Sequence, residues 1–108
     1  MSNSVESTIA EFRQVVNMTF KELDSWLDTN ESKEVGQFDG ENESIGHKSG
    51  QRIVQLLQKK DDYTEDELSH MKKVISYVHR HTAQRPSGDI EHTRWRYSLK
   101  NWGHDPLK

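Results

Sequence analysis

The sequence contains no cysteine, only two prolines and no long apolar run. Without cysteine, the chain forms no disulfide and offers no thiolate as a metal ligand or nucleophile. No stretch approaches the roughly 20 consecutive apolar residues that span a bilayer, so we expect no transmembrane helix and no membrane partner. Residues 1–6 have neither a basic start nor an apolar stretch, which argues against a signal peptide. These absences together predict a cytoplasmic protein.

Aliphatic side chains and phenylalanine are also scarce, since Leu, Ile, Val and Phe make up 22 of the 108 residues. Such a composition approaches that of disordered chains, but disorder also requires a high net charge, and the net charge here is only −3. Three Trp and three Tyr add bulk to the core. The length predicts a single small domain over 1–108, with no room for a second core.

Charge is unevenly distributed along the chain. Residues 1–47 carry three basic and ten acidic side chains, whereas residues 48–108 carry twelve basic and eight acidic ones, with five of the six histidines. The asymmetry is typical of a protein with one acidic and one basic face, the second of which meets a polyanion. An ordinary mixed-charge surface, whose halves neutralise each other in the fold, explains it equally well.

The spacing of apolar residues predicts an all-α fold, a compact bundle of four or five short helices with one long Gly-rich, acidic loop. The main predicted helices cover residues 4–17, 19–29, 49–60 and 64–82. Two of them begin with the same signal, a threonine followed three residues later by glutamate and flanked by apolar residues: Thr19 with Glu22, and Thr64 with Glu67. We therefore expect both threonines to cap their helices.

Two further segments are less regular. Residues 30–47 are rich in glycine and glutamate and have few apolar anchors, which predicts a mobile loop. Residues 93–102 are compatible with a helix, which aligns Trp95, Leu99 and Trp102, or with a strand. The helix is favoured because the sequence offers no second strand for pairing.

Motifs for catalysis or metal binding are absent from the sequence. His79 and His81 are two residues apart, so they lie on different faces of a helix and cannot chelate together. A site made from His92, His104 and an acidic residue is the remaining alternative. Ser98, His104 and Asp105 are the residue types of a catalytic triad, but the sequence around Ser98 lacks the turn that exposes a nucleophilic serine. No glycine-rich phosphate loop follows a strand, so the sequence has no nucleotide-binding motif. We expect no enzyme activity, no metal and no cofactor.

Basic residues alternate with aromatic ones in the second half. Seven basic residues are candidates for contacting nucleic-acid phosphates: Lys72, Lys73, Arg80, Arg85, Arg94, Arg96 and Lys100. Trp95, Tyr97 and Trp102 lie between or beside them, where aromatic rings can stack on bases. The competing interpretation is structural, with Trp95 and Trp102 in the core. In that interpretation Arg94 and Arg96 pair with the acidic first half.

Several stretches of the chain together resemble a known family. The two longest are Thr93-Arg94-Trp95-Arg96-Tyr97-Ser98-Leu99 and Asn101-Trp102-Gly103-His104-Asp105-Pro106-Leu107-Lys108. Shorter ones are residues 16–19, 22–23, 26–27, 49–57, 79–81, 83–86 and 88–89. They resemble domain-of-unknown-function family 3140, a family of small proteins. Its members are often labelled DNA-binding, so the resemblance implies DNA as a partner without implying an activity.

The leading interpretation is non-enzymatic binding of nucleic acid, DNA above all, through the basic C-terminal half. The alternative is a protein-interaction or stress-associated accessory module, whose contact surface is the loop or an exposed apolar groove. The negative net charge of the whole chain favours the alternative, because dedicated nucleic-acid-binding domains are usually basic.

Overall fold

The computed structural model describes residues 4–35, 45–60 and 62–108, and all regular structure within these ranges is α-helical. The described residues form six helices: α1 (Ser4–Val15), α2 (Phe20–Leu27), α3 (Asn30–Glu34), α4 (Ile45–Gln58), α5 (Glu65–Thr82) and α6 (Arg94–Asn101). The predicted all-α fold is confirmed, and the tail is a helix rather than a strand. The additional helix is α3, a short segment that the sequence analysis placed in a loop. Among the described residues, no helix has the length and apolarity needed to cross a membrane.

The predicted loop over 30–47 is wrong at both ends. The hydroxyl of Thr29 accepts a hydrogen bond from the amide of Ser32 at 3.1 Å and caps α3. Helix α4 begins at Ile45, before the predicted start at residue 49, so Gly46 is helical. Gly46, which the predicted loop includes, is buried where α4 approaches α6, and Gly50 of the predicted helix is also buried at a close helix contact. Residues 36–44 of the predicted mobile loop lie outside the described residues.

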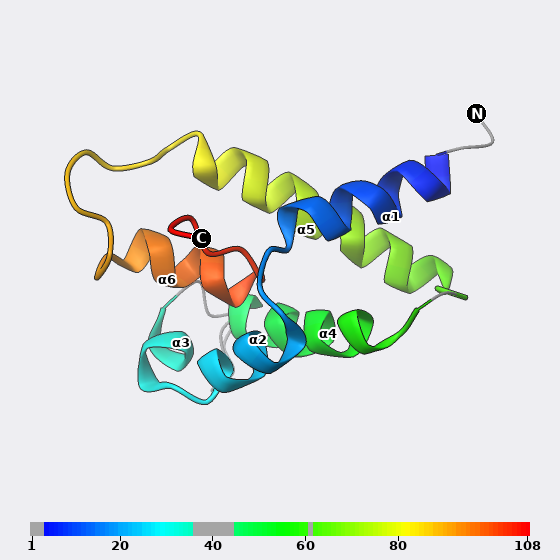
Figure 1. Cartoon of the computed structure of the whole chain (residues 1–108), viewed down its shortest axis with the longest axis horizontal. Coiled ribbons are helices and arrows are strands. Elements are labelled where there is room, and N and C mark those ends of the chain that lie inside the picture. The colour runs from blue at the N-terminus through cyan, green and yellow to red at the C-terminus, as the bar shows by residue number, and fades with distance from the viewer. Residues whose placement is uncertain (1–3, 36–44, 61) are drawn as a thin grey trace.

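The helices form two packed pairs (Figure 1). Helix α1 packs across α5, and α2 packs against α4. Helix α6 contacts both pairs and also α3. The core therefore draws on five helices, each of which contributes at least one side chain that is at most 2% exposed: Phe12, Leu23, Ile53, Met71 and Leu99.

Both predicted capping boxes are confirmed. In the first box, the amide of Glu22 donates to the Thr19 hydroxyl at 3.1 Å and the amide of Thr19 donates to the Glu22 carboxylate at 2.8 Å. In the second box, Thr64 and Glu67 repeat the arrangement at 3.1 and 2.7 Å. Each box satisfies backbone donors that would otherwise lack partners at the start of a helix.

A buried asparagine joins three of the helices. The Oδ1 atom of Asn101 on α6 accepts from Trp26 Nε1 of α2 at 2.8 Å and from Ser32 Oγ of α3 at 2.5 Å. Its Nδ2 atom donates to the backbone oxygen of Ser32 at 3.0 Å. A fully buried amide is stable only when such partners are present. Asn101 therefore explains why the short, polar α3 is held against the core.

Candidate functional site

A cavity of about 680 Å³ lies between α5, α6 and the start of α4, and is large enough for a nucleotide-sized ligand. Most of one wall comes from α5, which contributes Ser69, Lys72, Lys73, Ser76, Tyr77 and Arg80. Their spacing of three and four residues places these side chains along one face of the helix. The opposite face of α5 buries Met71, Val74 and Val78 in the core. The apolar periodicity of α5 thus directs its basic residues to the cavity.

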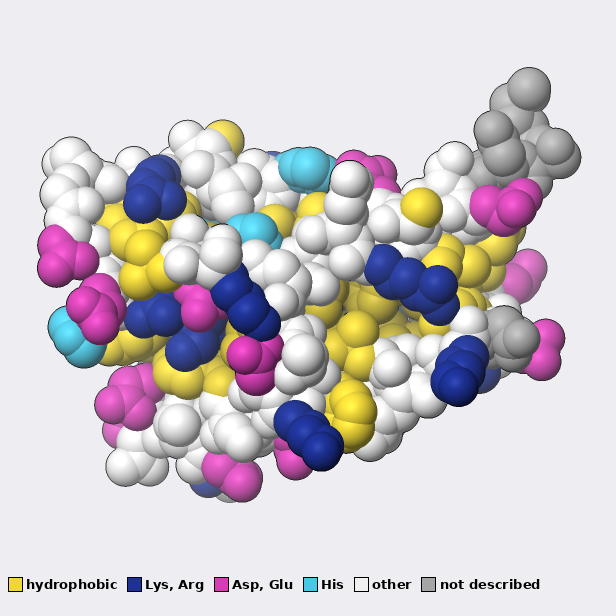
Figure 2. Space-filling view, viewed as in Figure 1, with side chains coloured by type: hydrophobic (Ala, Val, Ile, Leu, Met, Phe, Trp, Pro, Cys, Tyr) yellow, Lys and Arg dark blue, Asp and Glu magenta, His cyan; other side chains and the backbone are white. Residues whose placement is uncertain are grey.

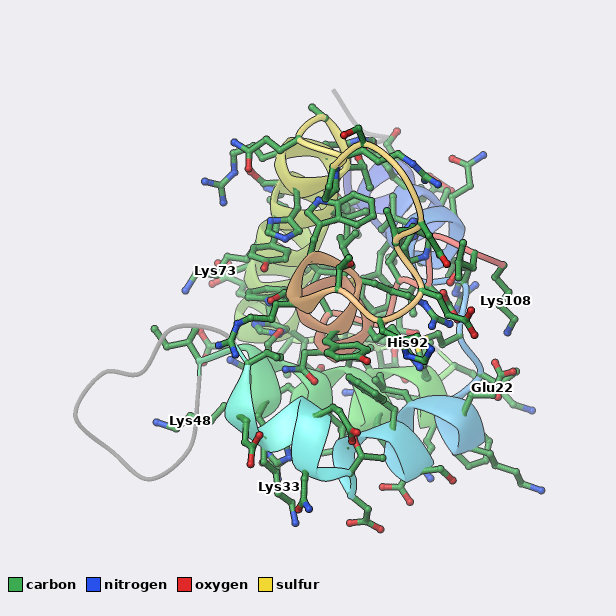
Figure 3. The ribbon with its side chains drawn as sticks, turned by 90° about the vertical axis from the view of Figure 1, so that its left-hand side faces the viewer. Glu22, Lys33, Lys48, Lys73, His92 and Lys108 are labelled. Carbon is green, nitrogen blue, oxygen red and sulfur yellow. The ribbon has the colours of Figure 1, made fainter. Side chains whose placement is uncertain are left out.

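The cavity wall carries three cationic side chains. Lys72, Lys73 and Arg80 form neither a hydrogen bond nor an ion pair within the described part of the chain, and no described residue that lines the cavity is acidic. Figure 3 places Lys73 on the same side of the molecule as Lys48, opposite Glu22 and Lys108. Positive charge around a hollow raises the local concentration of anions.

The pKa values of neighbouring groups reflect burial and this positive charge. The pKa of His70 is lowered to about 4, chiefly by burial and to a smaller extent by the nearby cations Arg52 and Lys73. Burial raises the pKa of Tyr77, against the opposing effects of a hydrogen bond with Ser98 and of the charge on Arg80. Both side chains are therefore neutral at pH 7.

Aromatic rings from α5 and from the C-terminal segment form a continuous stack. Its order is His70, Trp102, Tyr77, His81 and Trp95, with successive centroids 6.2, 4.3, 4.9 and 6.1 Å apart and interplanar angles between 12° and 16°. Both faces of the Tyr77 ring are covered, and Trp102 is only 8% exposed. The rings therefore stack on one another and leave no open face of Tyr77 for a base. This arrangement supports the core interpretation for Trp102.

Two of the other residues predicted to contact phosphates, Arg96 and Lys100, interact instead with side chains of the protein itself. Arg96 forms an ion pair with Asp105 at 3.0 Å. Its partner lies in the second half of the chain, so the predicted pairing with the acidic first half is wrong for Arg96. The Nζ atom of Lys100 lies 4.1 Å from the centroid of the Trp26 ring, as in a cation–π contact. Burial, followed by the charge on Arg96, lowers the pKa of Lys100.

The last two residues predicted to contact phosphates, Arg85 and Arg94, are exposed. Arg94 reaches the first half of the chain, where it donates to the backbone oxygen of Glu34 at 3.4 Å. Arg85 lies over the outer end of the aromatic stack, with its guanidinium carbon 5.7 Å from the centroid of the Trp95 ring. The seven predicted residues thus do not form one patch, because only Lys72, Lys73 and Arg80 meet at the cavity. On the face drawn in Figure 2, basic side chains are scattered among acidic and apolar ones.

The structure adds residues that sequence analysis missed. Arg52 of α4 lines a second cavity of about 200 Å³ together with Lys73, Ser69 and the acidic Asp66, so charges of both signs border this cavity. Ser49 and His70 form a hydrogen bond of 2.9 Å, but both are buried, so the pair does not resemble an accessible nucleophile. No periodic or motif signal identifies either feature, because each joins residues of two helices. Among the described residues, no three His, Asp or Glu side chains converge as metal ligands would.

Comparison with known proteins identifies a family. Neither a curated protein nor a solved structure is significantly similar to the chain. A family model described as a protein of unknown function, DUF3140, matches residues 11–100. The match includes all of α2 to α5, nearly all of α6, and the three cations at the cavity. The chain therefore belongs to the DUF3140 family of proteins of unknown function.

Proposed function

We propose that the protein binds nucleic acid, DNA above all, without enzymatic activity, and that α5 contacts the phosphate backbone. The observation that carries this proposal is the set of three cations at the cavity, Lys72, Lys73 and Arg80, which have no anionic partner in the described part of the chain. Folded proteins usually neutralise close positive charges, so such a set is available for an external polyanion. Phosphates bound there would release condensed counterions, which is the main source of non-specific affinity.

The geometry of α5 supports contact with more than one phosphate. Lys73 and Arg80 are seven residues apart, which corresponds to roughly 10 Å along a helix axis. The basic residues would bind phosphate oxygens through charge and hydrogen bonds. The ring of Tyr77 is already stacked between His81 and Trp102, so it offers no face on which a base could stack. We therefore expect weak binding with little sequence preference, with a dissociation constant on the order of 10⁻⁴ to 10⁻⁶ M at physiological salt.

A salt-dependent fluorescence titration tests the proposal, with labelled single-stranded DNA, duplex DNA and RNA as separate probes. Affinity should be highest at low salt and should fall linearly on a log–log plot as salt rises. Lys73→Gln and Arg80→Gln should each reduce that slope by roughly 0.7–0.9. Lys33→Gln is the matched control, since Lys33 is an exposed lysine of α3 that does not line the cavity.

Two results would contradict the proposal. One is the absence of binding to every nucleic acid at low salt, where electrostatic attraction is strongest. The other is an equal loss of affinity in Lys33→Gln and Lys73→Gln, which would show that only the net charge matters. Absence of binding would favour the alternative, a protein-interaction or accessory module.

A further inference from the structure

The indole nitrogen of Trp102 differs from those of the other two tryptophans. Trp26 Nε1 donates to the side chain of Asn101 at 2.8 Å, and Trp95 Nε1 donates to the backbone oxygen of His81 at 2.7 Å. Trp102 Nε1 has no acceptor within the described part of the chain, although the residue is only 8% exposed. Trp102 Nε1 is not fully enclosed, so its N–H is open to an acceptor from outside the chain.

The unpaired N–H lies at the wall of the cavity. Trp102 and Gly46 both line it, and a Cβ atom at Gly46 would lie 3.2 Å from Trp102 Nε1. Glycine at this position thus keeps the approach to the indole nitrogen open, where any other side chain would crowd it. An acceptor for this N–H would therefore enter from the cavity.

The remaining polar groups of the cavity also favour an acceptor-rich ligand. The ammonium and guanidinium groups of Lys72, Lys73 and Arg80 are donors only. Asn101 also lines the cavity, but its side-chain amide is already bonded to α2 and α3. The wall therefore offers positive charge and N–H donors, with serine hydroxyls that can also donate. This chemistry fits an oxyanion and disfavours a cation.

We propose that this cavity is a binding site for a phosphate monoester, whose oxygens accept hydrogen bonds from Trp102 Nε1 and from the cations of α5. A monoester carries a charge of about −1.5 to −2 at pH 7 and has three terminal oxygens. An internal phosphodiester carries one charge and two such oxygens, so it matches three cations less well. The monoester can come from the end of a nucleic-acid strand or from a free nucleotide; taking the strand end as its source rests on the proposed function.

The three indole N–H groups provide a residue-specific test by ¹H–¹⁵N NMR. Five probes are titrated at low salt: single-stranded oligothymidylate of about ten nucleotides with a terminal 5′-phosphate, with a 3′-phosphate or with neither, thymidine 5′-monophosphate, and inorganic phosphate. The resonance of Trp102 should shift with every probe that carries a monoester or free phosphate. The resonances of Trp26 and Trp95 should stay in place, because their N–H groups are already bonded inside the protein.

Affinity measurements give the second readout. A terminal phosphate should tighten binding of the oligonucleotide roughly tenfold, through charge-assisted hydrogen bonds. Lys73→Gln and Arg80→Gln should remove most of this gain, and Lys33→Gln should preserve it. These variants exchange exposed side chains, so the folded state is expected to remain.

The outcomes separate the two proposals. If the unphosphorylated strand binds and a terminal phosphate adds nothing, the monoester site is refuted and the proposed function stands. If no strand binds but thymidine monophosphate shifts Trp102 alone, the site is supported with a free nucleotide as its source, and the proposed function fails. A gain in affinity without a shift of Trp102, or an equal shift of all three indoles, would overturn the assignment to this cavity.

Discussion

Arg96 and Asp105 form a two-point ion pair, in which Nε and Nη2 of the guanidinium lie 3.1 and 3.0 Å from the two carboxylate oxygens. Both side chains are largely buried, at 16% and 17% exposed. Arg96 also donates from Nη1 to the backbone oxygen of Glu91 at 2.9 Å. Two parallel charge-assisted bonds are the strongest form of this interaction. The pair joins α6 to the segment after it, so the guanidinium is engaged within the fold.

We predict that Arg96→Gln lowers the free energy of unfolding by roughly 1–2 kcal/mol, because Asp105 is left partly buried without its partner. Asp105→Asn should cost a similar amount, and the double variant should lose less than the two single losses together. Urea unfolding measures all three. The salt slope of nucleic-acid binding should be unchanged in Arg96→Gln. A drop in slope as large as that of Lys73→Gln would show that Arg96 is a phosphate contact after all.

The capping boxes predict a second effect on stability. Thr19→Ala and Thr64→Ala should each lower the free energy of unfolding by about 1 kcal/mol, because each removes the side-chain acceptor of a helix-start amide. Thr19→Ser and Thr64→Ser retain the hydroxyl and serve as controls with smaller losses. Thermal unfolding followed by circular dichroism measures the difference. Equal losses in the Ala and Ser variants would mean that the hydroxyl bonds contribute little.

Stability should fall on mild acidification because of His70. Its pKa is about 4 in the folded protein, below the ordinary value near 6.5, chiefly because the ring is buried. Between these two values the unfolded chain binds a proton that the folded protein does not, so the stability present above pH 6.5 is lost as the pH falls toward 4. We expect a loss on the order of 1–2 kcal/mol between pH 7 and pH 5, after allowance for solvent screening.

Urea unfolding at pH 7 and pH 5 tests the role of His70. In His70→Gln the difference between the two pH values should shrink, whatever the absolute stability of the variant. His92→Gln is the control, since the side chain of His92 is 81% exposed. His81, whose pKa is also lowered by burial and then by Arg80, accounts for a remaining part of the pH dependence. An unchanged difference in His70→Gln would refute the assignment.

Two glycines should respond differently to alanine. At Gly50 a Cβ atom would lie 2.6 Å from the backbone oxygen of Asn101 and 2.6 Å from Leu27 Cδ2. Because the backbone oxygen cannot turn aside, Gly50→Ala should cost about 3 kcal/mol or prevent folding. At Gly88, where φ is +83° and no atom lies within 4 Å, Gly88→Ala should cost only the backbone strain of roughly 1 kcal/mol. Comparable losses in thermal unfolding would argue against close contact between α4 and α6.

The positions of most helices could be predicted from the sequence, because the signals that define them are local. The apolar spacing of α5 and the pairs Thr19–Glu22 and Thr64–Glu67 involve residues at most a few turns apart. The same spacing places Lys72, Lys73 and Arg80 away from the apolar face of α5, and all three line the cavity. Locally determined features of this kind require no knowledge of the partner helix.

The rest depended on contacts between residues distant in sequence. The N-cap of α3 is local, but its burial comes from bonds between Ser32 and Asn101. Gly46, which the predicted loop includes, lies in α4 close to Asn101 and Trp102. Arg96 and Lys100 have the same charge as the cavity residues, yet Asp105 and the Trp26 ring hold them elsewhere. Charge, composition and spacing determined that this chain is helical, with basic residues in its second half. Only tertiary packing decided which cations are paired inside the fold and which border a cavity, because pairing depends on which helices meet.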